Sequence, residues 1–160
     1  MFALVWSSVL PTAATPYTVV QSRLAKFAAS PMVVIPVARA RVFGLIAIVG
    51  IALLQAFNSF ACYGHDLPGY LGALAFIAVP MAPALIVLFT KNPLRAIAAS
   101  LLFAPWLAFA YYTDCIRPYQ GGGASMIYVA VLMYGLPCTL AGALLGGPVL
   151  RGMGISTREA

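Results

Sequence analysis

Long apolar stretches alternate with short polar gaps along most of this chain. No Asp, Glu, Lys, Arg or His lies inside the four longest stretches. Each of them approaches the ~20 residues that a helix needs to cross ~30 Å of hydrocarbon at ~1.5 Å per residue. In lipid, only helices and closed β-barrels satisfy the hydrogen bonds of the backbone. Continuous apolar runs lack the alternating pattern of barrel strands, so these stretches are expected to be helices. The pattern therefore predicts an all-α membrane protein, an up-and-down bundle of four transmembrane helices over residues 42–62, 70–90, 96–113 and 126–147.

These boundaries divide the chain into an N-terminal arm (1–41), a transmembrane domain (42–147) and a tail (148–160). The arm is harder to interpret, because residues 1–22 are apolar but contain Pro11 and Pro16. Three interpretations remain open. The arm is cytoplasmic, or it forms an interfacial or weak fifth helix, or the gene start is over-extended and Met32 is the first residue. A secretory signal would require a basic region before the apolar run, and this chain has none there.

Composition and charge placement support a membrane location and suggest an orientation. Hydrophobic residues make up 63% of the chain and charged residues only 8%, against about 25% charged in soluble domains, which excludes a soluble enzyme. Eight of the nine Lys and Arg residues lie in the two terminal segments and the second gap, and Arg117 alone lies in another gap. Basic residues stay in the cytoplasm, so we expect both termini to be cytoplasmic. The net charge of +6 is thus a topology signal, and we expect no nucleic acid partner.

Arginine outnumbers lysine among these basic residues, and Ala and Gly are abundant. This usage is typical of a GC-rich bacterial genome and suggests a bacterial inner membrane, with a mitochondrial inner membrane as the alternative. Many aromatic residues cluster toward the face opposite the termini, where amphipathic rings favour the headgroup level. They therefore support the same orientation.

Two cysteines, Cys62 and Cys115, fall on the predicted outer side. They form a structural disulfide, stay as free thiols, or act as a redox pair, and the sequence leaves these alternatives open. In a simple up-and-down bundle the first and third helices are diagonal, which counts against a bridge. His65 adds a weak metal site with the two cysteines, since thiolate and imidazole are ligands that zinc and copper prefer. A metal site and a disulfide exclude each other, and we expect no metal or other cofactor. Cys138 lies inside the fourth span and is interpreted as a small packing residue.

The first span carries a polar face. Gln55, Asn58 and Ser59 are spaced so that they share one side of a helix, together with Cys62. Polar side chains in hydrocarbon seek partners. The face is therefore expected to point into the bundle or toward another subunit, or to line a ligand cavity.

Proline and glycine mark the later spans. Prolines that we expect to kink helices near their midpoints are Pro80, Pro83, Pro105 and Pro137. Gly142 and Gly146 form a GxxxG pattern, which lets helices approach closely. They would serve in a dimer, in docking to a subunit, or in packing within the same bundle.

No catalytic constellation is present, so we do not expect an enzyme. The leading hypothesis is a small integral membrane protein that acts by association, as an accessory subunit, assembly factor or scaffold of an inner-membrane complex. Its partners would be the lipid bilayer and other membrane subunits or further copies of itself. The first alternative is a small homo-oligomeric transporter or channel for a neutral or apolar solute, with a path near Gln55, Asn58, Pro80 and Pro105. The second is an outer-face thiol or metal-binding membrane protein.

Overall fold

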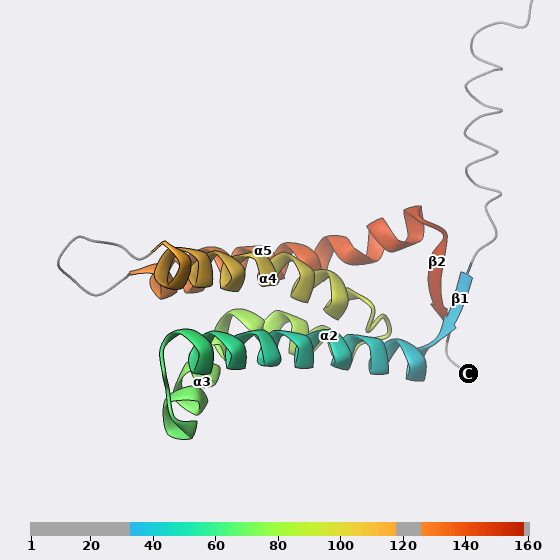
Figure 1. Cartoon of the computed structure of the whole chain (residues 1–160). Coiled ribbons are helices and arrows are strands. Elements are labelled where there is room, and N and C mark those ends of the chain that lie inside the picture. The colour runs from blue at the N-terminus through green and yellow to red at the C-terminus, as the bar shows by residue number, and fades with distance from the viewer. Residues whose placement is uncertain (1–32, 118–125, 159–160) are drawn as a thin grey trace, which may run out of the picture. The chain divides into compact units, whose positions relative to one another are not determined.

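Four helices make up most of the chain that the computed structural model describes, residues 33–117 and 126–158 (Figure 1). They are α2 (Val37–Phe57), α3 (Leu67–Leu88), α4 (Arg95–Tyr111) and α5 (Ile127–Gly152). Two π-helical turns, η1 (Asn58–Cys62) and η2 (Tyr112–Ile116), continue α2 and α4 without a break. With these turns included, all four helices are long and apolar enough to cross a membrane. The predicted all-α bundle of four such helices is confirmed.

Two helix ends lie well beyond the apolar runs. The first begins at Val37 rather than at residue 42, and the last ends at Gly152 rather than at residue 147. Arg39 and Arg41 are therefore helical. The membrane tolerates them there because long basic side chains at a helix end reach the interface while their stems stay on apolar surface. The predicted weak helix at 1–22, most of the N-terminal arm and the Gly-rich connection at 118–125 lie outside the described residues.

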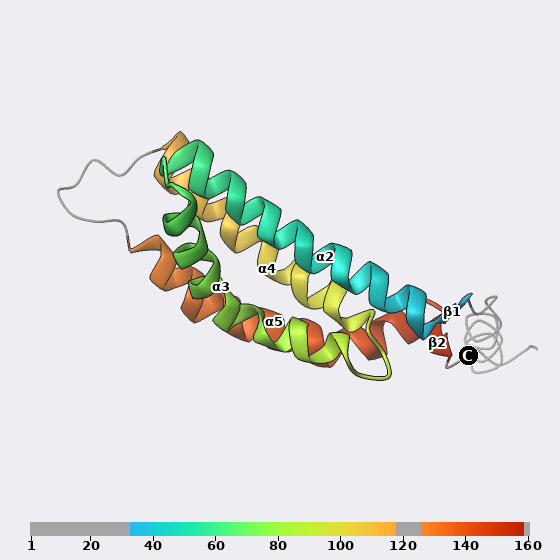
Figure 2. The same cartoon turned by 90° about the horizontal axis from the view of Figure 1, so that it is seen from below.

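The helices alternate in direction, but their neighbours differ from those of a simple up-and-down ring. Helix α4 packs against α2, α3 and α5, whereas α2 and α5 barely touch. Figure 2 shows α2 beside α4, and α3 beside α5. The assumption that the first and third spans are diagonal is therefore wrong. The diagonal pair consists of the first and the fourth.

A two-stranded parallel sheet closes one end of the bundle. Strand β1 (Val33–Pro36) precedes α2, and β2 (Ile155–Arg158) follows α5, with Val33 opposite Ile155 and Pro36 opposite Arg158. Gly154 has φ of +76° and reverses the chain between α5 and β2, a conformation that glycine adopts at little cost. We call this end the strand end. The pairing joins residues that had been assigned separately to the arm and the tail.

The core is built largely around α4. Phe103 and Leu107 on α4 are fully buried, as are Ile77 on α3 and Val131 on α5. Phe103 packs against Gly135, where an added Cβ would lie 2.5 Å from the nearest ring atom. The absence of a side chain at Gly135 therefore makes room for the largest side chain of the core.

Candidate functional site

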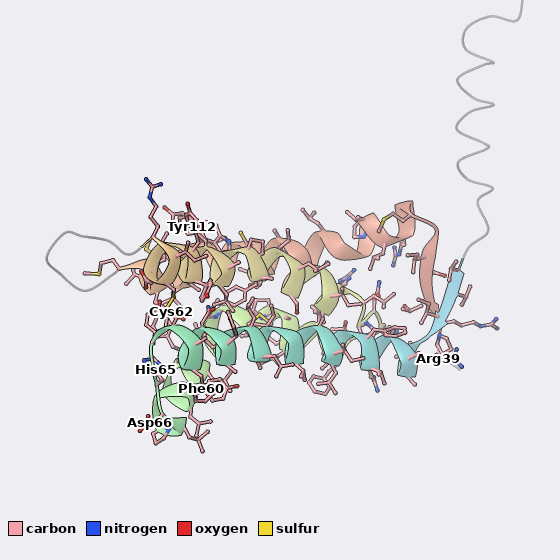
Figure 3. The ribbon with its side chains drawn as sticks, in the orientation of Figure 1. Arg39, Phe60, Cys62, His65, Asp66 and Tyr112 are labelled. Atoms are coloured by element: carbon pink, nitrogen blue, oxygen red, sulfur yellow. A yellow bond between two sulfur atoms is a disulfide. The ribbon has the colours of Figure 1, made fainter. Side chains whose placement is uncertain are left out.

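A disulfide joins Cys62 and Cys115 at the end of the bundle opposite the sheet, with Cα atoms 5.6 Å apart. We call this the disulfide end. Both cysteines lie in the π-helical turns, one ending η1 and the other within η2. Figure 3 shows Cys62 where the first helix ends, beside His65. Because α2 packs directly against α4, the two turns meet and the bridge needs no displacement of a helix.

A tight turn connects η1 to α3. Gly64 has φ of +60°, and the His65 backbone N–H donates to Ser59 O at 2.9 Å. Asp66 then caps α3, its Oδ1 accepting a hydrogen bond from Gly69 N at 2.9 Å. His65 and Asp66 are therefore set by local backbone geometry, and the carboxylate of Asp66 serves as a helix cap.

The polar face of the first span lies inside the bundle. Gln55, Asn58 and Ser59 are fully buried. Gln55 Nε2 donates to Ser59 Oγ at 3.2 Å and to the Tyr128 hydroxyl on α5 at 3.1 Å. Asn58 Nδ2 donates to Leu107 O on α4 at 3.1 Å, while Asn58 Oδ1 has no hydrogen-bond partner among the described residues. The polar face of the first span is thus connected to α5 through Gln55 and to α4 through Asn58.

Tyr63 is the central residue of the disulfide end. Its hydroxyl donates to Asp114 Oδ2 on η2. Its ring stacks on His65 with centroids 5.5 Å apart and meets Tyr128 edge-on at 5.7 Å. Burial, reinforced by the hydrogen bond to Asp114, raises the pKa of the Tyr63 phenol well above its ordinary value. The phenol therefore stays neutral and remains a hydrogen-bond donor.

Four rings in series form the wall of an open hollow of about 360 Å³. The series runs from His65 through Tyr63 and Tyr128 to Phe76, which meets Tyr128 edge-on at 6.2 Å. We call this site the aromatic hollow, and its lining residues are Tyr63, His65, Gly69, Ala73, Phe76 and Tyr128. Because Gln55 and Asp114 each hold one of the tyrosine hydroxyls, the wall is fixed from both α2 and η2.

The weak metal site is not assembled. Cys62 and Cys115 are bonded to each other, so neither sulfur is a thiolate ligand, and His65 stacks on Tyr63 instead. Within residues 33–117 and 126–158, no three His, Cys, Asp or Glu side chains gather in a group that could hold a metal ion. The sulfurs that the metal interpretation needs as ligands are therefore bonded to each other in this structure.

The glycine pattern packs within the bundle. A Cβ at Gly142 would lie 2.6 Å from Ala99 Cα, and one at Gly146 would lie 2.8 Å from Ala98 Cβ, both on α4. Free Cys138 is half-buried and lies 3.2 Å from Trp106 Nε1, which donates to its sulfur. Of the three roles expected for the glycines, close packing of α4 on α5 is the one the contacts describe.

The prolines do not converge on a common space. Pro80 and Pro83 are buried in α3, which is visibly curved in Figure 2, and Thr139 Oγ1 on α5 donates to Pro80 O at 2.5 Å. Pro105 and Pro137 are exposed on the outside of their helices. Pro105 therefore does not join Gln55 and Asn58 along an internal path.

Sequence reasoning missed the aromatic hollow and the cap at Asp66. An Asp followed by Leu-Pro-Gly is a typical helix start and could have placed the beginning of α3 at Leu67. Tyr63, Phe76 and Tyr128 carried no comparable signal, because their rings meet only through the packing of α3 and α5 around the turn.

Four apolar helices around a buried core, with their polar groups turned inward or gathered at the ends, fit a small integral membrane protein. In comparisons with protein-family models, curated proteins and solved structures, no significant match was found.

Proposed function

We propose that this protein acts by association, as an accessory subunit or scaffold that holds another membrane protein through the aromatic hollow. The observation that carries the proposal is the hollow itself, walled by four rings and open on one side. Tyrosine and other aromatic residues are enriched in protein interfaces, and binding energy concentrates where an anchor side chain fills a pocket. The expected occupant is an apolar side chain from a loop of the partner.

The shape of the hollow favours a protein partner over a small solute. Small-molecule sites occupy about 300–1,000 Å³ and enclose most of their ligand. This hollow, at about 360 Å³, is at the small end of that range and is open. A side chain presented by a larger partner needs no such enclosure, because the partner covers the opening.

The disulfide end is proposed to face the periplasm of a bacterial inner membrane, with both termini cytoplasmic. Two features support this orientation independently. Disulfides persist in the oxidising periplasm, and six of the seven described basic residues lie at the strand end, Arg117 being the exception, which matches the positive-inside rule. A reporter inserted at Gly122 should be active outside and one fused after Ala160 inside, and the reverse pattern would refute the orientation.

The test of association is purification of the full-length tagged chain from native membranes in mild detergent, with quantitative mass spectrometry of what co-elutes. Ala73→Trp would fill the hollow from its lining, whereas Ala75→Trp adds the same ring to an exposed position on the same helix that is not part of the lining. We expect a stoichiometric membrane protein with the wild type and with Ala75→Trp, and its loss with Ala73→Trp.

Two results would contradict the proposal. Equal recovery of the partner by both tryptophan variants would place the interface elsewhere. An apolar small molecule that co-elutes with the wild type and is displaced only by Ala73→Trp would make the hollow a ligand site instead. Elution volume and thermal unfolding of both variants show whether either substitution has disturbed the fold.

A further inference from the structure

The strand end carries a second hollow, of about 280 Å³, with a very different lining. Its residues come from the connection between α3 and α4, from the end of α5 and from β2. We call it the basic hollow, and its lining residues are Lys91, Asn92, Arg151, Ser156 and Thr157. It lies at the other end of the helices from the aromatic hollow and does not depend on the function proposed for that site.

The sheet brings these three segments together. After α5, the turn at Gly154 sends the chain into β2, which is held by its pairing with β1. Thr157 Oγ1 then donates to Lys91 O at 3.2 Å. Ser156 and Thr157 of β2 thereby line the same hollow as Lys91 and Arg151.

Positive charge in this region is not balanced by a described carboxylate. Among the described residues the two acidic side chains, Asp66 and Asp114, lie at the disulfide end. The Arg95 guanidinium lies against Gly147, where an added Cβ would be 2.6 Å from its Nε. Gly147 is one helical turn before Arg151 on the same face of α5, so Arg95 contacts α5 one turn away from a lining residue of the hollow. The Nε of Arg95 is buried and has no hydrogen-bond partner among the described residues.

We propose that the basic hollow binds a phosphate group, and that its source is the headgroup of an anionic phospholipid. Guanidinium, ammonium and hydroxyl donors together are the groups that recognise phosphate, and basic pockets at the cytoplasmic ends of membrane helices bind acidic headgroups. Large exposed apolar side chains lie close in the chain to lining residues on two of the three contributing segments. Phe89, two residues before Lys91, is 77% exposed, and Met153, two residues after Arg151, is 60% exposed. A lipid would cover them with its acyl chains, whereas a free phosphate ion would not.

The experiment measures lipid binding to the purified full-length protein in neutral detergent, by native mass spectrometry during titration with phosphatidylglycerol or phosphatidylcholine. The test variants are Lys91→Gln and Arg151→Gln, both at exposed positions, so that the fold should tolerate either. Arg39→Gln is the matched control, since it removes one charge from the same end (Figure 3) without touching the lining. A parallel titration with inorganic phosphate tests the free ion.

We expect phosphatidylglycerol to bind and phosphatidylcholine not to. Each test variant should weaken phosphatidylglycerol binding by about tenfold or more, as the loss of a hydrogen bond to a charged group implies, while the control changes it by about twofold or less. Equal weakening in all three variants would overturn the site in favour of diffuse attraction to the basic end. Binding of inorganic phosphate alone, with the same dependence on Lys91 and Arg151, would support a phosphate site and overturn the lipid as its source.

Discussion

The contact between α4 and α5 at Gly142 gives the sharpest test of the bundle. An added Cβ at this position would lie 2.6 Å from Ala99 Cα and 2.7 Å from both Ala98 O and Ala99 N. Unlike side-chain atoms, these backbone atoms have no rotamer by which to move aside. The substitution Gly142→Ala therefore forces the two helices apart.

The magnitude follows from the distances. Carbon atoms pack best at about 3.5–4.0 Å, and a gap of ~0.5–1 Å forfeits a quarter to a half of each dispersion contact. Restoring a normal distance at Gly142 requires a displacement of this order along the interface that also buries Phe103 against Gly135. Overpacking of this kind costs about 1–3 kcal/mol.

Gly50→Ala is the matched control. Gly50 lies inside α2, and nothing comes within 4 Å of a Cβ built there. Replacing a helical glycine by alanine in open space is neutral or gains up to about 1 kcal/mol. The free energy of unfolding should therefore be lower in Gly142→Ala than in Gly50→Ala by about 1–3 kcal/mol, the cost of overpacking.

The assay is equilibrium unfolding in mixed micelles with increasing SDS, followed by tryptophan fluorescence. Trp106 on α4 stacks on Tyr134 of α5 with centroids 5.1 Å apart, so its emission reports the separation of these two helices. A Trp6→Phe background removes the second tryptophan. Equal stability of the two alanine variants would refute the close approach at Gly142. A change in oligomeric state without a change in monomer stability would return the glycines to a role in dimers.

Three further predictions concern the disulfide, the strand end and Tyr63. Under denaturing conditions a maleimide should label one thiol, Cys138, before reduction and three thiols after it, and three labels before reduction would disprove the bridge. Reduction should lower the free energy of unfolding by up to about 4 kcal/mol, because the bridge spans 53 residues. Gly154→Ala places an L-residue at φ of +76° and should lower the free energy of opening the β1–β2 pair by about 1–2 kcal/mol. The strand amides should then exchange faster, and the control Gly152→Ala should leave their exchange unchanged. Because burial and its hydrogen bond raise the pKa of Tyr63, the folded state holds this proton more tightly than the unfolded chain. The resulting stability is present below about pH 10, the ordinary phenol pKa, and is lost above it. A Tyr63→Phe variant whose stability falls as steeply as that of the wild type between about pH 10 and 12 would contradict this assignment.

The apolar runs were enough to predict the number and approximate position of the helices, because a membrane span must be both long and uncharged. They were not enough to place the helix ends. Arg39 and Arg41 were excluded by their charge, and the last span was ended at residue 147, yet Arg39, Arg41 and Pro148 are all helical. Near the interface a basic side chain is solvated and the loss of one hydrogen bond is tolerated, so composition alone misplaces these boundaries.

The candidate site was harder to predict because it depends on which helices are neighbours. The spacing of Gln55, Asn58 and Ser59 predicted a shared polar face, but not that Gln55 would meet Tyr128 or that Asn58 would meet a backbone carbonyl. The partner of Asn58 follows from α4 lying beside α2, whereas Gln55 meets Tyr128 across the bundle on α5. No local pattern in the chain specifies either arrangement. The strands were missed for a related reason, since Val33–Pro36 pairs with residues more than a hundred positions away.

The chemistry of the two ends suggests where selection for function would act. Inside the bundle, Gln55 and Thr139 make hydrogen bonds to other helices. Such a polar group could bind a passing solute only by breaking a contact that stabilises the fold. At the disulfide end the situation is reversed, because the contacts that fix the open aromatic hollow, those of Gln55 and Asp114, lie behind its wall. A membrane protein built in this way can recognise something at each surface without opening its core. If both proposals hold, the bundle keeps the aromatic hollow and the basic hollow at its opposite ends.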